Sequence, residues 1–342
     1  MIMSILKTLT TGTLAVLAMA STLSAKDFSG AELYTNEEYT YGKFEARMKM
    51  AAASGTVSSM FLYQNGSEQA SAQRWVEVDI EVLGKNPNSF QSNIITGKAG
   101  AQVTSEKHHS VSPAADQGFH TYGLEWTPDY VSWTLDGKEV RRTKKGDNKN
   151  QVENLIGTQG LRFNIWSSES AEWVGNFDES KLPLFQFINW VKVYKYTPGR
   201  GENGSDFTLD WTDNFDSFDS GRWSKGNWTF DGNRVDLTPN NIYSKAGMLI
   251  LALTRKGEES FNGQVPQDNE PAPVSSSSVT PPPESSSSSE PFIPPMSSSS
   301  EPITAIQQVR TPQMQPKEVR GIVNAKGAHV KEINRYRVNF KY

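Results

Sequence analysis

Apolar and polar residues alternate along much of this chain with the period of two that side chains have along a β-strand. Residues 43–50 give an unbroken example, in which Phe44, Ala46, Met48 and Met50 share one face and charged residues share the other. Further short runs rich in β-branched and aromatic residues predict strands at 56–64, 75–83, 90–96, 120–126, 131–135, 160–166, 185–196, 206–211 and 248–254.

Turn signals separate several of these runs. Asp136-Gly137 is a strong hairpin signal and Thr127-Pro128-Asp129 marks a second turn, so residues 122–140 are predicted to form a meander. No stretch of any length has helical periodicity. Many short strands without long helices predict an all-β fold, a two-sheet antiparallel β-sandwich.

One predicted strand carries an unusual acidic face. Within residues 75–85, Glu77, Asp79 and Glu81 point to one side, and the branched apolar residues between them point to the other. Three like charges on one face repel each other and raise the pKa of at least one of them, so stability alone does not explain the pattern. Neighbouring carboxylates perform acid and base chemistry on glycosidic bonds. A solvent-facing strand or a calcium site is the alternative interpretation.

The stretches around the acidic strand suit a neutral polar ligand. Residues 60–65 lie upstream and residues 91–93 downstream, and both supply aromatic rings or amides. Sugar rings offer apolar C–H faces to aromatic rings and hydroxyl groups to amides. The combination predicts a sugar cleft.

Composition narrows the class of protein. The chain has 342 residues and a formal net charge of -4, with a pI of about 5.7, so its charge does not point to a nucleic-acid partner. We also expect a monomer. Because it has no cysteine, disulfides, thiolate nucleophiles and cysteine zinc sites are excluded. The four histidines lack metal-ligand spacing, and no cofactor is expected for the chemistry.

Changes in composition divide the chain into four parts. Residues 1–25 match a secretory signal peptide, with cleavage after Ala25 or Ala20, and predict a secreted protein with no transmembrane segment. Residues 26–265 form the predicted catalytic domain, and residues 266–302 are a linker rich in Pro and Ser. Residues 303–342 hold eight Lys and Arg against two Glu. This basic segment is expected to engage a cell surface or export machinery, or else to be a solubilising tail.

The acidic strand resembles the active-site strand of glycoside hydrolase family 16, and within it that of the bacterial 1,3-1,4-β-glucanases, or lichenases. The resemblance covers about residues 42–256 and includes Gly55 to Phe61, His120-Thr121-Tyr122, Asp136-Gly137 and Asn164-Ile165-Trp166. Residues 214–254 resemble a segment that most lichenases carry at the start of the domain. The chain is therefore similar to the circularly permuted lichenases of the Fibrobacter type, which have a concanavalin-like jelly roll.

The resemblance also implies roles for individual residues. It makes Glu77 the nucleophile, Glu81 the general acid and then base, and Asp79 the residue that tunes the pair, whereas spacing alone leaves the two Glu roles interchangeable. It places a group of aromatic, amide and guanidinium side chains in the cleft: Phe61, Tyr63, Asn65, Gln91, Asn93, Arg162, Asn164, Trp166, Trp173 and Trp228. It further implies a structural calcium ion held by Asn189, Asn214 and Gly247.

The resemblance implies an endo-acting retaining hydrolase that cleaves β-1,4 bonds next to β-1,3 bonds in mixed-linkage β-glucans. A 1,3-β-glucanase or a xyloglucan transglycosylase of the same family is the first alternative, and a non-catalytic glucan-binding lectin is the second. Three carboxylates would give a lectin no advantage. Among nine Trp several must belong to the core, and Trp133 and Trp190 are expected there.

Overall fold

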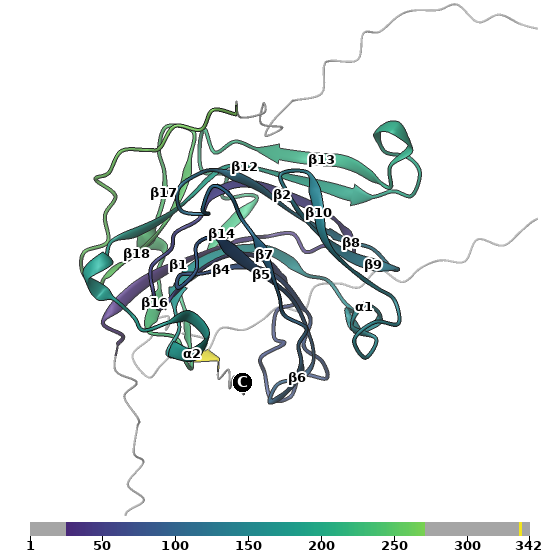
Figure 1. The fold of residues 1–342 in the computed structure, drawn as a ribbon, viewed down its shortest axis with the longest axis horizontal. Coiled ribbons are helices and arrows are strands. Elements are labelled where there is room, and N and C mark those ends of the chain that lie inside the picture. Colours follow the sequence, from purple (N-terminus) through teal and green to yellow (C-terminus); the bar gives the residue numbers. More distant parts are fainter. Residues whose placement is uncertain (1–24, 271–334, 337–342) are drawn as a thin grey trace, which may run out of the picture.

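The computed structural model describes residues 25–270 and 335–336. Two curved antiparallel sheets lie one over the other (Figure 1). The first, here called sheet I, consists in spatial order of β14 (Trp223–Lys225), β1 (Phe28–Thr35), β11 (Gly160–Ser167), β3 (Thr56–Tyr63), β4 (Glu77–Leu83), β5 (Ser89–Lys98) and β7 (Lys107–Ser110).

The second sheet, sheet II, is built around the long strand β12 (Leu184–Tyr196). One edge of β12 pairs with β2, and its other edge pairs with β18 along its first half and with β13 along its second half. The remaining strands extend the sheet on either side: β2 (Gly42–Lys49), β8 (His120–Trp126), β9 (Tyr130–Leu135), β10 (Lys138–Lys144), β13 (Phe207–Asp213), β17 (Ile242–Ser244) and β18 (Leu249–Arg255).

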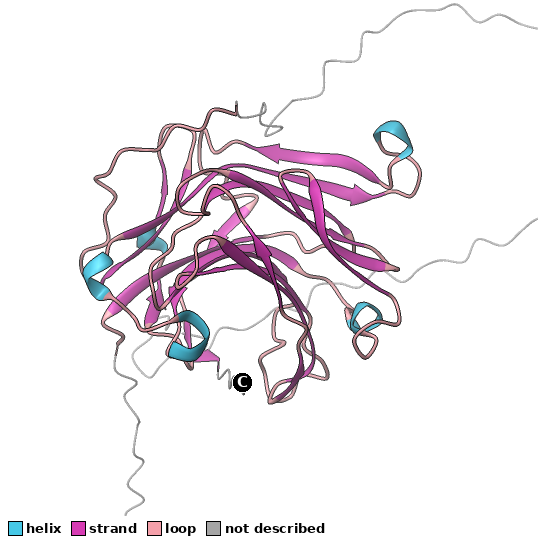
Figure 2. Ribbon diagram, in the orientation of Figure 1, coloured by secondary structure: helices cyan, strands magenta, loops and turns pink. Residues whose placement is uncertain are grey.

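The other elements are short. Strand β6 (Ala101–Val103) forms a hairpin with β5, β16 (Val235–Leu237) pairs in parallel with β1, and β15 (Thr229–Phe230) pairs in parallel with β19 (Arg335–Tyr336). The helices are single turns at the periphery (Figure 2): α1 (Gln151–Asn154), α2 (Ala171–Val174) and the 3₁₀ turns Glu179–Lys181, Glu202–Gly204 and Pro239–Asn241. Among the described residues, no helix has the length and apolar character needed to cross a membrane.

The two sheets bury one continuous apolar core between them. From β4 of sheet I, Val78, Ile80 and Val82 are fully buried in it, and from sheet II Trp133 is fully buried in the same cluster. Trp133 is thus in the core as expected. Trp190 is buried but is not part of this core: it pairs with Arg47 on the other face of sheet II, because an irregularity in the β12–β2 register between Ile188 and Trp190 leaves Val191 facing the core instead. Because the apolar residues of β4 face this core, its carboxylates must face the other side of sheet I.

All ten strands expected from the sequence are present, and the two-sheet sandwich is confirmed. The predicted hairpin is also present, since Asp136 and Gly137 join β9 to β10 with positive φ angles of 50° and 74°, as a tight hairpin turn requires. Strand β1 was not expected. Its residues Ala31 and Leu33 face the core, while Glu32 and Tyr34 face the opposite side.

The first and last strands of the sandwich lie side by side. Phe28 and Ser29 of β1 pair with Arg255 and Thr254 of β18, and the Lys256 amide donates to the Asp27 carbonyl oxygen at 2.9 Å. Figure 1 shows the two strands, purple and green, at the same edge of the molecule. A fold whose ends meet in this way accommodates the permuted order of segments that the sequence indicates.

After β18 the chain runs back over sheet II as a strap, residues 256–270. Phe261 packs on Phe185 with ring centroids 4.9 Å apart, and Asp268 accepts two hydrogen bonds of 2.9 Å from the guanidinium group of Arg47. Asp268 lies beyond the predicted domain boundary at 265, so ordered contacts with the sandwich continue into the predicted linker. The predicted signal peptide (up to residue 24), most of the linker and the basic segment apart from 335–336 lie outside the described residues.

Candidate active site

Every second side chain along the strands of sheet I points to the face that lies away from the core. Asp79 on β4 is paired with Phe61 on β3 and with Asn93 on β5, and Glu81 is paired with Gln91 on β5. Directly paired residues of neighbouring strands point to the same side of a sheet. The period of two therefore carries the expected catalytic and binding side chains to one face, although they are far apart in the sequence.

This face is the floor of a cleft with a volume of about 760 Å³. The three residues expected to be catalytic, Glu77, Asp79 and Glu81, all line it. So do all ten residues expected to bind substrate: Phe61, Tyr63, Asn65, Gln91, Asn93, Arg162, Asn164, Trp166, Trp173 and Trp228. The structure thus brings the whole expected site together in one place.

Glu77 and Glu81 have different surroundings. Burial raises the pKa of Glu77 to about 7, although hydrogen bonds with Trp75 and Asp79 and the positive charge of Arg162 favour its ionised form. Burial raises the pKa of Glu81 to about 8, and the negative charges of Glu77 and Glu106 act in the same direction. Glu77 is therefore the more easily ionised of the two, and Glu81 is the better holder of a proton.

Asp79 lies between the two glutamates along β4. Burial raises the pKa of Asp79 well above its ordinary value, and the charges of Glu77 and Glu81 reinforce that effect. The hydrogen bond between Asp79 and Glu77 raises the pKa of Asp79 and lowers that of Glu77. This is the arrangement in which a protonated Asp79 donates its O–H to an ionised Glu77.

A buried ion pair occupies the side of the cleft formed by β1 and β11. Nη1 of Arg162 donates to Oε1 of Glu32 at 2.5 Å, and Nη2 donates to the side-chain oxygen of Asn65. Asn164, the next residue of β11 that faces the cleft, accepts a 2.6 Å hydrogen bond from the hydroxyl of Ser59. These bonds fix the orientation of amide and guanidinium groups that can bind sugar hydroxyls.

Aromatic rings form much of the cleft wall. The ring centroid of Trp166 lies 5.8 Å from that of Trp173 and 5.0 Å from that of Phe230. Trp173 also donates through its indole N–H to Oε1 of Gln91 at 3.3 Å, which ties the wall to β5. Such a cleft presents flat apolar faces beside oriented polar groups, as a polysaccharide-binding site requires.

Several lining residues were not expected from the sequence, among them Glu32, Tyr34, Trp75, Glu106 and Phe230. Glu32 and Tyr34 alternate with Ala31 and Leu33, so a short pattern with a period of two is the sequence signal that could have located them. Trp75 lies two residues before Glu77, so the same period of two could have placed it on the acidic face. Glu106 follows β6 in a connection without regular structure, and no sequence pattern marks it.

The residues expected to hold calcium are only partly assembled. A Cβ atom at Gly247, whose φ is +68°, would lie 3.6 Å from Oδ1 of Asp216 and 4.0 Å from the carbonyl oxygen of Asn214. Oxygen atoms of Asp216 and Asn214 therefore lie near Gly247, and oxygen is the donor type that a hard cation takes. The Nδ2 atom of Asn189 instead donates to Oδ2 of Asp268 at 2.8 Å. Within the described ranges, no group of three or more His, Cys, Asp or Glu side chains could hold a metal ion.

Comparison with known proteins finds several similar chains. A β-glucanase of Fibrobacter succinogenes (strain ATCC 19169 / S85) is 72% identical over 99% of this chain and 100% of its own length. A β-glucanase of Brevibacillus brevis is 35% identical over 52% of this chain and 63% of its own length. Among solved structures, a prokaryotic β-1,3-1,4-glucanase (lichenase) derived from a mouse hindgut metagenome is 28% identical, with 47% of this chain and 77% of that chain covered at a TM-score of 0.40.

The sequence pattern of the family described as "Glycosyl hydrolases family 16" matches residues 6–192. That range includes the whole acidic strand and most of the cleft-lining residues, and it spans more than half of the 342-residue chain. Together with the 72% identity to a β-glucanase over nearly the full length, this match shows that the chain belongs to family 16 of the glycosyl hydrolases.

Proposed function

We propose that the protein is an endo-acting retaining β-glucanase that cleaves β-1,4 bonds next to β-1,3 bonds in mixed-linkage β-glucans. The observation that carries the proposal is the set of three carboxylates, Glu77, Asp79 and Glu81, on the floor of one aromatic cleft. The uninterrupted Glu-x-Asp-x-Glu alternation favours this specificity over that of the 1,3-β-glucanases, many of which have an extra residue before the second Glu. The relative of 72% identity is itself named a β-glucanase.

In the first step, Glu77 attacks the anomeric carbon and forms a glycosyl ester while the glycosidic bond breaks. Glu81 gives its proton to the leaving oxygen, so the departing chain leaves as an alcohol. In the second step, Glu81 removes a proton from water, the water oxygen attacks the anomeric carbon, and Glu77 is released as a carboxylate. Two inversions leave the configuration of the sugar unchanged.

The surroundings of the two glutamates support these roles. A nucleophile must be ionised, and Glu77 has two hydrogen-bond donors, Trp75 and Asp79, as well as the positive charge of Arg162. A general acid must hold its proton near neutral pH, and burial with the charges of Glu77 and Glu106 favours protonated Glu81. Asp79 then acts on Glu77 by donating a hydrogen bond to it.

The cleft wall would bind the glucan without taking part in proton transfer. Trp166, Trp173 and Trp228 offer flat faces to pyranose rings, while Asn65, Gln91, Asn93, Asn164 and Arg162 offer donors and acceptors to hydroxyl groups. A cleft suits an endo-acting enzyme, since a long chain can lie across it and be cut internally. Secretion would fit the same function, because the substrate is a polymer too large to enter a cell.

The proposal keeps calcium as a structural ion held by oxygen atoms of Asn189, Asn214 and Gly247, with no part in the chemistry. Carbonyl and amide oxygens are suitable ligands for it. Added calcium should raise the melting temperature of chelator-treated protein and leave kcat at 25 °C unchanged, with magnesium as the control. A melting temperature that calcium does not change would contradict this part.

The substrate is tested by measuring reducing-end release from barley β-glucan, laminarin, xyloglucan and carboxymethylcellulose side by side. The proposal predicts that barley β-glucan is by far the best substrate and that its products are short oligosaccharides from the first minutes of reaction. Preference for laminarin would favour the 1,3-β-glucanase alternative. Chain transfer between xyloglucan molecules without net release of reducing ends would favour the transglycosylase alternative.

A further inference from the structure

Strand β10 contains a β-bulge that turns one arginine into the sandwich. Glu139 and Arg141 pair with the consecutive residues Thr134 and Trp133 of β9, so Val140 is the extra residue. Without the bulge, Glu139 and Arg141 would lie on the same face of sheet II. With it, Glu139 is solvent-accessible whereas Arg141 is buried, only 5% exposed.

Inside the sandwich, Arg141 crosses from sheet II to sheet I. Its guanidinium carbon lies 4.3 Å from the ring centroid of Trp133. Nη1 donates to the carbonyl oxygen and the hydroxyl of Ser92 on β5, each at 2.9 Å, and Nη2 donates to the hydroxyl of Ser105 at 2.8 Å. Within the part of the chain that the structure describes, these hydrogen-bond partners are a carbonyl and two hydroxyls rather than a carboxylate.

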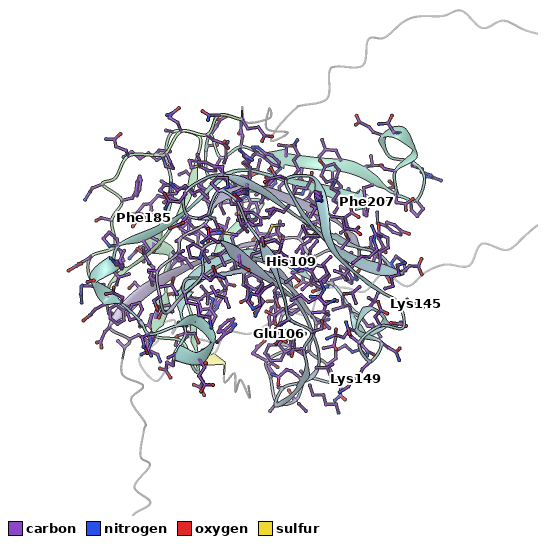
Figure 3. The ribbon with its side chains drawn as sticks, viewed as in Figure 1. Glu106, His109, Lys145, Lys149, Phe185 and Phe207 are labelled. Atoms are coloured by element: carbon purple, nitrogen blue, oxygen red, sulfur yellow. The ribbon has the colours of Figure 1, made fainter. Side chains whose placement is uncertain are left out.

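Two of the residues that Arg141 contacts, Ser105 and Trp133, are hydrogen-bonded in turn to residues of the cleft. The Ser105 amide donates to Oδ1 of Asn93 at 2.9 Å, and Asn93 is the cross-strand partner of Asp79. The indole N–H of Trp133 donates to the carbonyl oxygen of Asp79 at 2.9 Å. Ser105 also precedes Glu106, which lines the cleft. Figure 3 labels Glu106 and His109, which come from the same segment of chain as Ser105.

Fold stability does not explain this arrangement. Burial lowers the pKa of Arg141 to about 10, against the attraction of Glu106 and Asp79, so the interior disfavours its charge. Among the described residues, its Nε atom has no hydrogen-bond partner. An apolar side chain of similar length would fill the same space without the cost of desolvating a cation. Retention of a cation at this point is therefore better explained by what it does for the cleft.

We propose that Arg141 is a positioning residue for glycosidic cleavage: it holds the cleft wall at residues 104–106 and Asn93 against β4, and its positive charge offsets part of the negative charge of the carboxylates. The inference rests on the proposed function. Arg141 does not line the cleft and acts through Ser105, Trp133 and its electric field. A carboxylate paired with Arg141 would neutralise its positive charge, whereas its hydroxyl and carbonyl partners are neutral and do not.

The charges around Arg141 determine how its loss changes the pH profile. The titratable and charged groups near Arg141 and its neighbours come from β4, from β7 and from the connection that precedes β7. They are Glu77, Asp79 and Glu81 on β4, Glu106 in the connection, and Lys107, His108 and His109 on β7. His109 is held neutral near pH 7, because burial and the charge of Arg141 lower its pKa to about 4. Removing the cation therefore affects mainly the carboxylates.

The test compares Arg141→Met and Arg141→Lys with Arg142→Met, all in the full chain. Arg142 is a matched control, because it is the adjacent residue on the outer face and pairs with Glu139. The measurements are kcat, KM, melting temperature and the pH profile of kcat/KM on the polysaccharide of the panel that the parent cleaves best. In that profile, the acid limb reports ionisation of Glu77 and the alkaline limb reports deprotonation of Glu81.

Arg141→Met is expected to lower kcat at least tenfold with a smaller change in KM, and to move both limbs to higher pH by about half a unit, since loss of a cation raises carboxyl pKa values. Arg141→Lys should restore the limbs and only part of kcat, because an ammonium group keeps the charge but not the planar fork. Arg142→Met should match the parent.

A second variant covers the case in which Arg141→Met does not fold. Ser105→Ala keeps the cation and removes its bond to the wall, so kcat should fall while both limbs stay in place. Unchanged kcat and unchanged limbs in a folded Arg141→Met protein, or unchanged kcat in Ser105→Ala, would overturn the inference. A parent that cleaves no polysaccharide of the panel would instead contradict the proposed function.

Discussion

Oε1 of Glu32 lies 2.5 Å from Nη1 of Arg162, and both side chains are almost completely buried beside the cleft. The two residues come from β1 and β11, which are neighbours in sheet I. Burial raises the pKa of Glu32 while the charge of Arg162 lowers it, so each charge depends on the other. The pair orients Arg162 toward Asn65 and keeps a cation close to Glu77.

Replacing Glu32 by Met should therefore leave a buried, uncompensated cation. We expect the free energy of unfolding to fall by about 3–5 kcal/mol, and kcat/KM to fall because Arg162 is free to turn away. Urea unfolding and kinetics on barley β-glucan measure the two effects. Glu139→Gln is the control, since it breaks an exposed pair with Arg142 that should contribute about 1 kcal/mol or less. Equal effects of the two substitutions would contradict this role of Glu32.

The catalytic carboxyls should make the protein less stable as pH rises. The pKa of Glu81 is about 8 in the folded protein, against about 4.3–4.5 in an unfolded chain. Between these values the folded state holds a proton that the unfolded state has lost, so unfolding becomes easier as pH increases. Glu81→Gln removes the part of this dependence that comes from Glu81.

We expect Glu81→Gln to melt at a higher temperature than the parent at pH 8, by several degrees at about 2–4 °C per kcal/mol, with the difference shrinking toward pH 4.5. Differential scanning calorimetry across this range measures it. Glu45→Gln, on sheet II away from the cleft, serves as the control. A difference that stays constant with pH would show that the proton of Glu81 has its ordinary affinity in the folded protein.

The strap after β18 should be part of the stable domain. Asp268 binds Arg47 through two hydrogen bonds and accepts another from Asn189. A chain ending at Gly263 loses these bonds, whereas one ending at Glu270 keeps them. Charged hydrogen bonds contribute about 1.5–3 kcal/mol each, so loss of the three should lower the melting temperature of the shorter chain by about 10 °C or more, at about 2–4 °C per kcal/mol.

Melting curves of the two truncated chains and of Asp268→Asn in the longer one measure this contribution. Activity at 25 °C should be the same in all three, because the strap covers sheet II and does not line the cleft. Identical melting temperatures for the chains ending at 263 and 270 would place the end of the domain at the boundary that composition alone indicates.

The sequence predicted most of the fold because sheet I and sheet II are built from strands with clear alternation. It predicted the acidic strand and its cleft partners because a period of two carries Asp79, Phe61 and Asn93 to one face. It missed β1, and with it Glu32, because Ala31 and Leu33 are the only large or medium apolar residues on the core face of that strand, and two positions are a weak periodic signal. The sequence did not predict the contacts of the strap or the burial of Arg141, because a β-bulge and contacts between distant segments leave no periodic signal.

The assignment of Glu77 as nucleophile and Glu81 as acid and base is tested most directly by azide rescue on an activated aryl β-glycoside. The leaving group of this substrate needs little acid assistance, so Glu81→Ala can still form the glycosyl ester on Glu77. Azide should then rescue Glu81→Ala with a product of retained configuration, and Glu77→Ala with a product of inverted configuration. The opposite pairing would exchange the two roles, and failure of azide to rescue either variant would contradict the double-displacement account.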